Sequence, residues 1–144
     1  MGYDKFRRKV IGKYQGNFYE TQNVLVGALT ATTGAGTPYS VVNPLGTALL
    51  VTKVVVYTTG AISATPVTLK VGIGSSAGGA YDNLIDDVVV GTPTGAGVFD
   101  NSDDKGTNGQ NTYIWGASEY LNVTVTGTPT GLVGKVYIYY VKPA

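Results

Sequence analysis

The amino-acid sequence predicts an all-β protein folded as a two-sheet β-sandwich. From about residue 22 onward, short runs of Val, Ile, Leu and Tyr alternate with clusters of Gly, Thr-Pro and Asn or Asp. The runs number roughly seven to nine, with turn signals about every 8 to 15 residues, as in two-sheet sandwiches. The pentapeptide Gly-Thr-Pro-Thr-Gly occurs at 91–95 and again at 127–131, each time after a β-branched run. Its proline and final glycine favour a type I turn, so we interpret the repeat as reused turn chemistry.

The first half of the chain contains three expected strands. The first lies at 22–29, and a loop of small residues at 30–37 leads to a short extended piece at 39–42. The longest candidate, 47–58, is apolar at alternate positions on both faces: Leu49, Val51, Val55 and Tyr57 lie with Lys53 on one face, and Leu50, Val54 and Val56 lie with Thr52 on the other. We therefore expect a central strand that is buried on two sides.

The second half continues the alternation. Val67, Leu69, Val71 and Ile73 alternate with small or polar residues, as do Leu121, Val123 and Val125. This period of two is typical of half-buried strands. Apolar runs at 84–90, 98–99 and 113–115 lie between them.

The final run, 135–141, is apolar on both faces. Val136, Ile138 and Tyr140 share one face, and Tyr137, Tyr139 and Val141 share the other. One face is expected to cover the sandwich core. The other needs a partner, so we predict that Tyr137, Tyr139 and Val141 form a self-association face, and that self-association also shields a sheet edge at this strand.

Charge divides the chain into an arm, 1–20, and a β-sandwich domain, 21–144. Residues 1–13 carry five basic groups and one acid, a net +4 (5 − 1), whereas the remaining residues carry five basic groups and eight acids, a net −3 (5 − 8). Phe6, Val10 and Tyr14 recur at a spacing of four, so a short helix would have one apolar side. The predicted docking arm, extended or helical, consists of Lys5, Phe6, Arg7, Arg8, Lys9, Val10, Lys13 and Tyr14. An acidic protein partner fits this arm better than nucleic acid, and a solvated terminus without a partner is the alternative.

The composition excludes much of enzyme chemistry. The chain contains no Cys and no His, so it has no thiol nucleophile, disulfide, imidazole base or Cys or His metal ligand. Charged residues make up only 13%, a composition that suits a protein packed against neighbours or one outside the cell. We expect neither a signal peptide nor a membrane span, because the basic N-terminal residues are followed by no long apolar run.

The remaining motifs are weak. Gly72 to Ala77 has the letters of a dinucleotide fingerprint, but the glycines that follow cannot sustain the required helix. The acidic loop at 100–108 departs from an EF-hand and reads as a polar surface loop, with calcium the alternative. Asp86 and Asp87 are adjacent on a strand and cannot flank one glycosidic bond, and the sequon at Asn122 lies inside a strand. We predict no catalytic residue, no cofactor and no metal ligand.

Residues 47–143 resemble the jelly-roll structural proteins of tailed bacteriophages, in particular head-decoration, cement and head-fibre proteins. The resemblance covers about two thirds of the chain and is carried by LVTKVVVYTTG at 50–60, VGIG at 71–74, YDNLI at 81–85, YLNVTVTG at 120–127 and KVYIYY at 135–140. It implies a jelly-roll fold and a non-enzymatic component of the virion, commonly a homotrimer, seated on a major capsid or other virion protein by a terminal arm. It implies no functional residue.

Two other functions stay open at this point. A carbohydrate- or receptor-binding sandwich would use Trp115 and loop tyrosines as stacking platforms, with calcium at Asp100 to Asp104. A hydrolase would have to rely on Asp and Glu alone, with two carboxylates brought together from distant loops.

Overall fold

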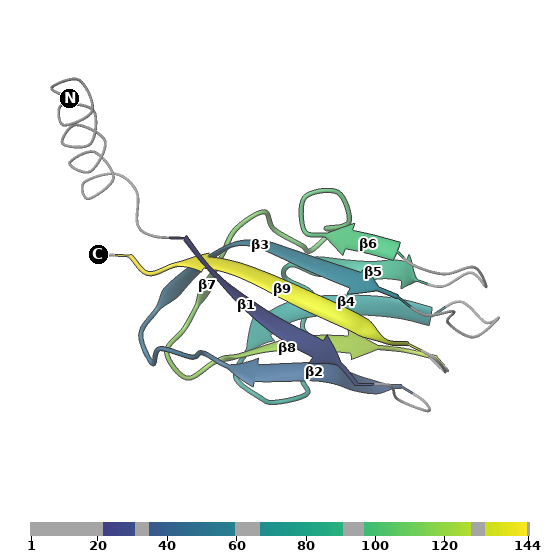
Figure 1. The fold of residues 1–144 in the computed structure, drawn as a ribbon, viewed down its shortest axis with the longest axis horizontal. Helices are drawn as coiled ribbons and strands as arrows, with labels where there is room; N and C mark the ends of the chain where they lie inside the picture. The colour runs from purple at the N-terminus through teal and green to yellow at the C-terminus, as the bar shows by residue number, and fades with distance from the viewer. Residues whose placement is uncertain (1–21, 31–34, 60–66, 91–96, 128–131, 144) are drawn as a thin grey trace, which may run out of the picture.

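The structure is a computed structural model that describes residues 22–30, 35–59, 67–90, 97–127 and 132–143. These residues form nine strands and no helix (Figure 1). The strands are β1 (Gln22–Leu29), β2 (Gly36–Val42), β3 (Leu49–Thr58), β4 (Val67–Gly74), β5 (Ile85–Val90), β6 (Gly97–Asp100), β7 (Tyr113–Trp115), β8 (Tyr120–Val125) and β9 (Gly134–Val141). The predicted docking arm and most of both Gly-Thr-Pro-Thr-Gly segments lie outside the described residues.

The strands form two antiparallel sheets. Sheet A has the order β1-β9-β3-β6, with β7 also paired to β3, and sheet B has the order β2-β8-β4-β5. Both β6 and β7 lie along β3, at its C-terminal and N-terminal halves respectively. Counted as one interrupted strand, they give two four-stranded sheets with jelly-roll connectivity. The all-β, jelly-roll-like sandwich predicted from the sequence is therefore confirmed.

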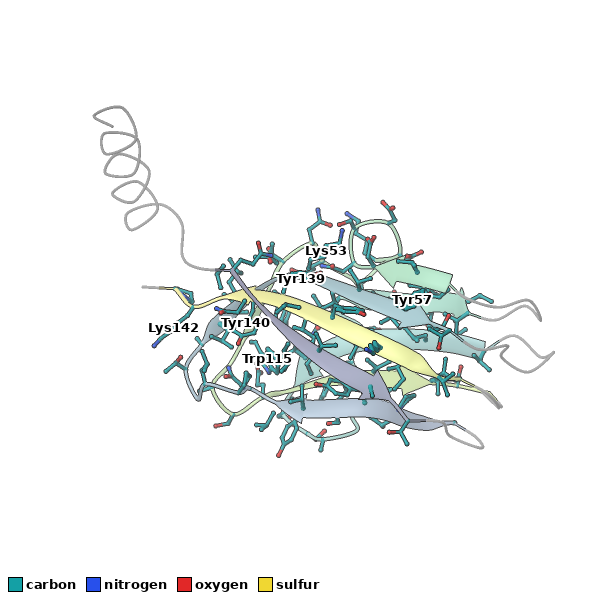
Figure 2. The ribbon with its side chains drawn as sticks, viewed as in Figure 1. Lys53, Tyr57, Trp115, Tyr139, Tyr140 and Lys142 are labelled. Atoms are coloured by element: carbon teal, nitrogen blue, oxygen red, sulfur yellow. The ribbon has the colours of Figure 1, made fainter. Side chains whose placement is uncertain are left out.

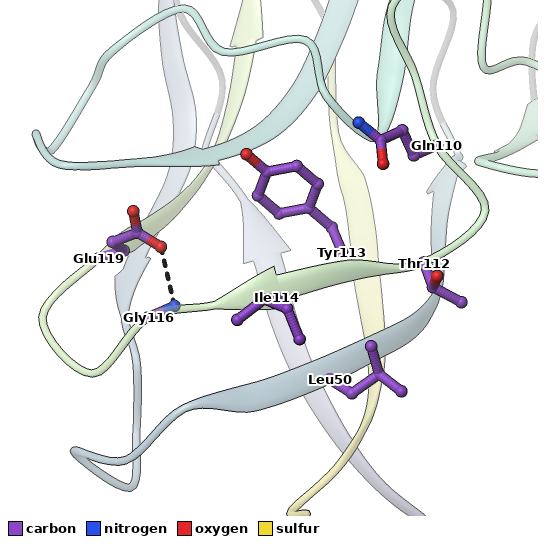
Figure 3. Close-up of a pocket in the computed structure, with 7 residues that line it drawn as sticks. All are labelled: Leu50, Gln110, Thr112, Tyr113, Ile114, Gly116 and Glu119. Atoms are coloured by element: carbon purple, nitrogen blue, oxygen red, sulfur yellow. Dashed lines mark hydrogen bonds between the residues drawn. The ribbon is translucent and has the colours of Figure 1, made fainter.

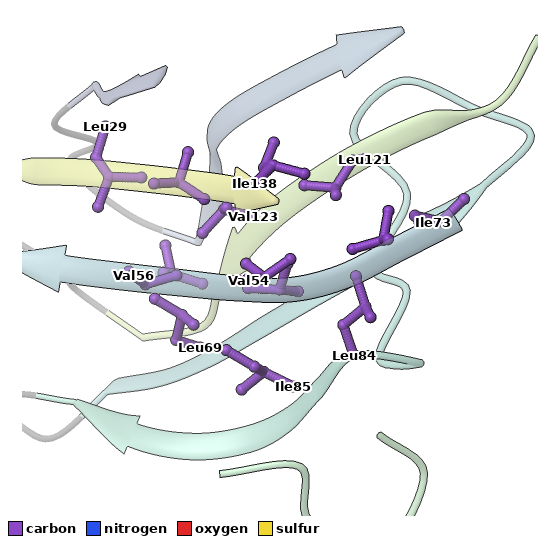
Figure 4. Packing of buried hydrophobic residues seen from close by; sticks show 14 of the residues in the cluster. Leu29, Val54, Val56, Leu69, Ile73, Leu84, Ile85, Leu121, Val123 and Ile138 are labelled. Carbon is purple, nitrogen blue, oxygen red and sulfur yellow. The ribbon is translucent and has the colours of Figure 1, made fainter. Parts of the chain in front are cut away.

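The core lies between the two sheets (Figure 4). Val54, Val56 and Ile138 from sheet A meet Leu69 and Val123 from sheet B, and all five side chains are fully buried. Each fully buried aliphatic side chain of this size stabilises the fold by about 1.5–3 kcal/mol relative to its exposed state. The alternation of core residues along β4, β8 and β9 is what the period of two predicts.

A bulge in β3 corrects the predicted faces of that strand. Val51 pairs with Tyr140 and Lys53 pairs with Tyr139, so Thr52 is an extra residue on the β3 side. The bulge turns two consecutive side chains outward and reverses the alternation that follows. The buried face is therefore Leu49, Val51, Val54 and Val56, and the outward face is Leu50, Lys53, Val55 and Tyr57. The expectation of burial on two sides was wrong, because this outward face stays accessible.

Two strands lie elsewhere than expected. β2 begins at Gly36, inside the predicted loop, and contains a buried Pro38. Proline is tolerated there because β2 is an edge strand of sheet B. β9 is not at a sheet edge, since it lies between β1 and β3 (Figure 1). Self-association through β9 therefore cannot shield an edge of that strand, and the edge on that side of sheet A belongs to β1.

The outer face of sheet B is partly covered by the chain between β4 and β5. The backbone and Cβ of Tyr81 lie against Gly72 and its ring lies against Gly74, so a Cβ atom at either glycine would clash with Tyr81. The amide nitrogen of Asn122 donates to the carbonyl oxygens of Ser76 and Gly79 at 2.9 and 3.0 Å. Asn122 is consequently buried, although the alternation had placed it on a solvated face.

Candidate interaction face

The outward side chains of sheet A form a largely apolar surface, which we call the outer face of sheet A. Antiparallel pairing sets Tyr137 of β9 between Val26 of β1 and Val55 of β3. Outward positions recur every second residue, so neighbouring rows line up in the same way. The apolar members of the face are Val24, Val26 and Ala28 of β1, Leu50, Val55 and Tyr57 of β3, Val98 of β6, Ile114 of β7, and Tyr137, Tyr139 and Val141 of β9.

Exposed apolar area is concentrated on this face. Nine large hydrophobic side chains are exposed among the described residues, and five of them lie here: Val24, Val26, Tyr57, Val98 and Ile114. Val98 is 63% exposed, Ile114 54% and Val24 50%. Single exposed apolar residues are ordinary, but a contiguous apolar patch marks an interaction site. The surface is therefore the strongest candidate for a functional site on the described part of the chain.

The predicted self-association residues lie in the middle of this surface. Tyr137, Tyr139 and Val141 project outward from β9 and are half-buried, because β1 and β3 flank them on both sides. They are not sealed inside the protomer. Figure 2 shows Tyr139 and Tyr57 on neighbouring strands of the sheet.

Sequence reasoning missed most of the remaining members. Val24 and Val26 alternate with Asn23 and Leu25, so period two could have assigned them to one side of β1. Leu50 of β3 pairs with Ile114 of β7, and Tyr57 of β3 pairs with Val98 of β6. These pairings depend on sheet order, which the sequence did not provide.

Two lysines interrupt this face: Lys53 in the middle of β3 and Lys135 near the start of β9. Lys53 lies opposite Tyr139, and its ammonium group reaches Asp100 on the outermost strand, with 3.9 Å between nitrogen and oxygen. The backbone amide of Asp103 holds the pKa of the Asp100 carboxyl below its usual value, with further contributions from the amide of Ser102 and the charge of Lys53. Lys135 lies at the Tyr57 end of β9. The centre of the face therefore carries no carboxylate.

Two shallow hollows mark the ends of the face. One, of about 340 Å³, is lined by Tyr57, Thr59, Gly134, Lys135 and Tyr137. The other, of about 630 Å³, includes the side chains of Leu50 and Ile114 and continues around β7 to Tyr113 (Figure 3). Its carboxylate, Glu119, accepts a hydrogen bond from the backbone N–H of Gly116 at 2.8 Å. Both hollows are open to solvent, so they are depressions in the surface and not closed ligand cavities.

The outer face of sheet B has a different character. Its exposed or half-exposed side chains include Ser40, Thr68 and Lys70, and Lys70 lies 3.7 Å from Asp82 and 3.5 Å from Asp87. Polar side chains and a covering loop make this a solvated surface. The outer face of sheet A therefore carries more of the exposed apolar area than that of sheet B, where the exposed large hydrophobic side chains are Val42 and Val89.

Several of the acidic residues considered above as hydrolase or calcium-site candidates accept hydrogen bonds from backbone amides of nearby loops. Asp86 and Asp87 lie at a bulge in β5, where Asp87 has a φ of 50°. Asp86 accepts hydrogen bonds from the amides of Thr107 and Asn108 at 3.2 and 3.0 Å. Asp100 accepts from the amides of Ser102 and Asp103 at 2.7 and 3.0 Å. Within the described ranges, no group of three or more acidic side chains is arranged to hold a metal ion.

The position of Trp115 rules out its predicted role as a stacking platform for carbohydrate. Its side chain is fully buried, and its indole N–H donates to the carbonyl oxygen of Glu119 at 2.8 Å (Figure 2). A buried indole has no free face on which a sugar ring could stack. Trp115 is a core residue and cannot serve as the stacking platform.

Three further sequence features have structural explanations. After Gly74 the chain makes a turn, with φ of 77° at Gly78, and starts no helix that could face a pyrophosphate. The buried Asn122 of the sequon uses its amide nitrogen for two backbone carbonyls and accepts from the Ser40 hydroxyl at 2.6 Å. Among the described residues, none lies in a helix of the length and apolarity needed to span a membrane.

Comparisons with known proteins give one structural likeness. No protein-family model matches the chain, and no curated protein sequence matches it. A solved chain from Bacillus endospore appendages, described as a novel family of disulfide-linked pili, is 19% identical, with a TM-score of 0.44. The match covers 85% of the present chain and 88% of that chain. At this level the likeness carries no argument about function, and the present chain has no cysteine.

Proposed function

We propose that this protein is a non-enzymatic structural subunit of a phage particle that decorates or stabilises the capsid through protein–protein contacts. The observation that carries the proposal is the outer face of sheet A, where five of the nine exposed large hydrophobic side chains of the described residues gather. A contiguous apolar surface of this kind is typical of a site where another protein binds. The jelly-roll strand order is the fold that the resemblance to phage virion proteins implies.

The distribution of acidic groups supports a structural role. Asp86, Asp100 and Glu119 each accept hydrogen bonds from backbone amides. Carboxylates used in this way stabilise loops, and a hydrolase would need a pair of them free in one cleft. The larger hollow contains one carboxylate, Glu119, among its lining residues.

The proposal assigns different partners to the two parts of the chain. The basic arm, which includes Lys5, Arg7, Arg8, Lys9 and Lys13, docks on an acidic surface of a major capsid or other virion protein. The sandwich contacts other copies of itself through the outer face of sheet A. Neither contact involves nucleic acid or membrane.

The test is the protein content of purified particles. Phage particles are banded from the source culture, and mass spectrometry measures the amount of this chain relative to the major capsid protein. We expect a fixed stoichiometric ratio, and we expect a chain lacking residues 1–14 to lose its binding to stripped particles. Absence of the chain from the particles would overturn the proposed function.

A further inference from the structure

We propose that the outer face of sheet A is covered by the same face of a second copy, so that the basic unit is a two-fold dimer packed sheet to sheet. The inference deepens the proposed function, because it names the partner and the geometry of the self-association face. It extends that face from three residues of β9 to eleven apolar residues on five strands. Three features of the surface identify a second copy as the occupant.

The first feature is chemical self-complementarity. The centre of the face consists of Tyr137, Tyr139 and Val55, and the Lys53–Asp100 pair on it compensates its own charge. An occupant must therefore be largely apolar and must tolerate a neutral ion pair beside the central tyrosines, because Lys53 lies opposite Tyr139 and Asp100 lies opposite Val55. On the described part of the chain, the outer face of sheet A is itself such a surface, whereas the outer face of sheet B presents Lys70, Asp82 and Asp87.

The second feature is shape. The sheets of a sandwich pack with their strand directions about 30° apart, because each sheet carries the same right-handed twist. Two copies of one sheet have equal twist, so they can interdigitate their side chains as the inner faces of A and B already do. The hollow between Tyr57 and Tyr137 provides space for side chains that protrude from the opposite copy.

The third feature is size. Four strands about 4.8 Å apart and eight residues long give a projected area of about 500 Å², with the eight-residue length set by the pairing of β1 and β9. The accessible surface of the protruding side chains exceeds this projection. One face is therefore near the low end of what each partner buries in a specific interface. We expect reversible association with a dissociation constant in the micromolar range.

The two-fold symmetry follows from the use of one patch. A surface that contacts its own copy forms an isologous interface, which closes as a dimer. A trimer, which the resemblance implies, needs two different patches that meet head to tail. The mass of the assembly therefore separates the two arrangements.

The first experiment is sedimentation equilibrium of the full chain with a matched pair of variants. Val24→Glu places a charge on the outer face of sheet A, and Val89→Glu places the same charge at an equally exposed position on β5 of sheet B; the two valines are 50% and 57% exposed. We expect wild type and Val89→Glu to form dimers, and Val24→Glu to weaken the dimer at least about tenfold by burying an unpaired charge. Circular dichroism verifies that both variants are folded.

The second experiment uses the absence of cysteine. Val55→Cys places a single thiol near the centre of the face, and Val89→Cys serves as its control. Packed sheets lie about 10 Å apart, so a bismaleimide of that span should link two Val55→Cys chains efficiently and should link Val89→Cys chains poorly.

Several outcomes would overturn the dimer. These are a wild-type monomer throughout the micromolar range, a trimer, equal effects of Val24→Glu and Val89→Glu, or equal cross-linking of the two cysteine variants. A monomer or trimer that is nevertheless present in purified particles would reject the face-to-face dimer and leave the proposed function standing. A dimer that is absent from purified particles would reject the proposed function and leave the face-to-face dimer standing.

Discussion

Gly27 of β1 lies directly against the ring of Tyr39 of β2, so that the ring occupies the place where a Cβ atom on residue 27 would be. The contact joins an edge strand of sheet A to an edge strand of sheet B at the open side of the sandwich. Gly27 is buried, and partial burial of the Tyr39 phenol raises its pKa. A backbone hydrogen bond from Thr30 to Pro38 closes the same side at 2.9 Å.

Gly27→Ala should therefore destabilise the protein. The added methyl group has to displace an aromatic ring, and overpacking of this kind costs about 1–3 kcal/mol. Urea unfolding measures the loss. Tyr39→Ala removes the obstacle, so Gly27→Ala should cost clearly less in the Tyr39→Ala background than in wild type. Equal costs in the two backgrounds would show that the ring is not the cause.

Asn101→Ala should be among the most damaging polar substitutions in the described residues. Asn101 is fully buried, accepts from the amide of Val54 at 2.8 Å, and donates to the carbonyls of Gln110 and Asn111 at 3.0 and 2.9 Å. Alanine leaves buried backbone groups without partners, so we expect a loss of about 2–4 kcal/mol in the free energy of unfolding. The exposed neighbour Ser102 provides a control, since Ser102→Ala should change stability by less than about 0.5 kcal/mol.

The strands could be predicted because their side-chain periods are visible in the sequence. The runs at 22–29 and 113–115 coincide with β1 and β7. The bulge at Thr52 could not be predicted, because the one-residue insertion is defined only against β9. It reversed the assignment of Val54 and Val55, and with it the outward composition of the central strand.

Buried asparagines account for much of what the sequence did not predict about the loops. Asn43 donates to the carbonyls of Thr47, Trp115 and Gly116, and its side-chain oxygen accepts from the amides of Leu45 and Gly46. Asn101 and Asn122 play similar roles at other loops. The contacts of Asn43 with Trp115 and Gly116 join residues distant in the sequence, so composition alone assigns this side chain to an ordinary polar turn. The candidate site could be predicted only in part. The two apolar faces of β9 follow from its own sequence, but the identity of its neighbouring strands depends on the sheet order.

Trp115→Ala should lower the stability of the fold, because Trp115 is a core residue and not part of a ligand site. The side chain is fully buried, so truncation should cost about 3–5 kcal/mol, and Trp115→Phe should cost less. Trp115 is the only tryptophan, so its native fluorescence should be blue-shifted and resistant to iodide quenching, and it should shift to the red on unfolding. Strong quenching of the native protein would contradict the burial, and it would restore Trp115 as a stacking platform.

Acid should weaken the loop that begins at Asp100. The pKa of this carboxyl is lowered in the folded state, chiefly by the amide of Asp103. A lowered folded pKa contributes stability above the unfolded pKa of about 3.9, and the contribution is lost as pH falls through the folded value. Asp100→Asn keeps an oxygen acceptor but removes the charge. The stability gap between wild type and Asp100→Asn should therefore be largest near neutral pH and should shrink below about pH 4. Urea unfolding at several pH values measures the gap, and Asp103→Asn, which removes an equal charge from the same loop, controls for net charge. A gap that widens on acidification would mean that the Asp100 carboxylate is not stabilised by these amides.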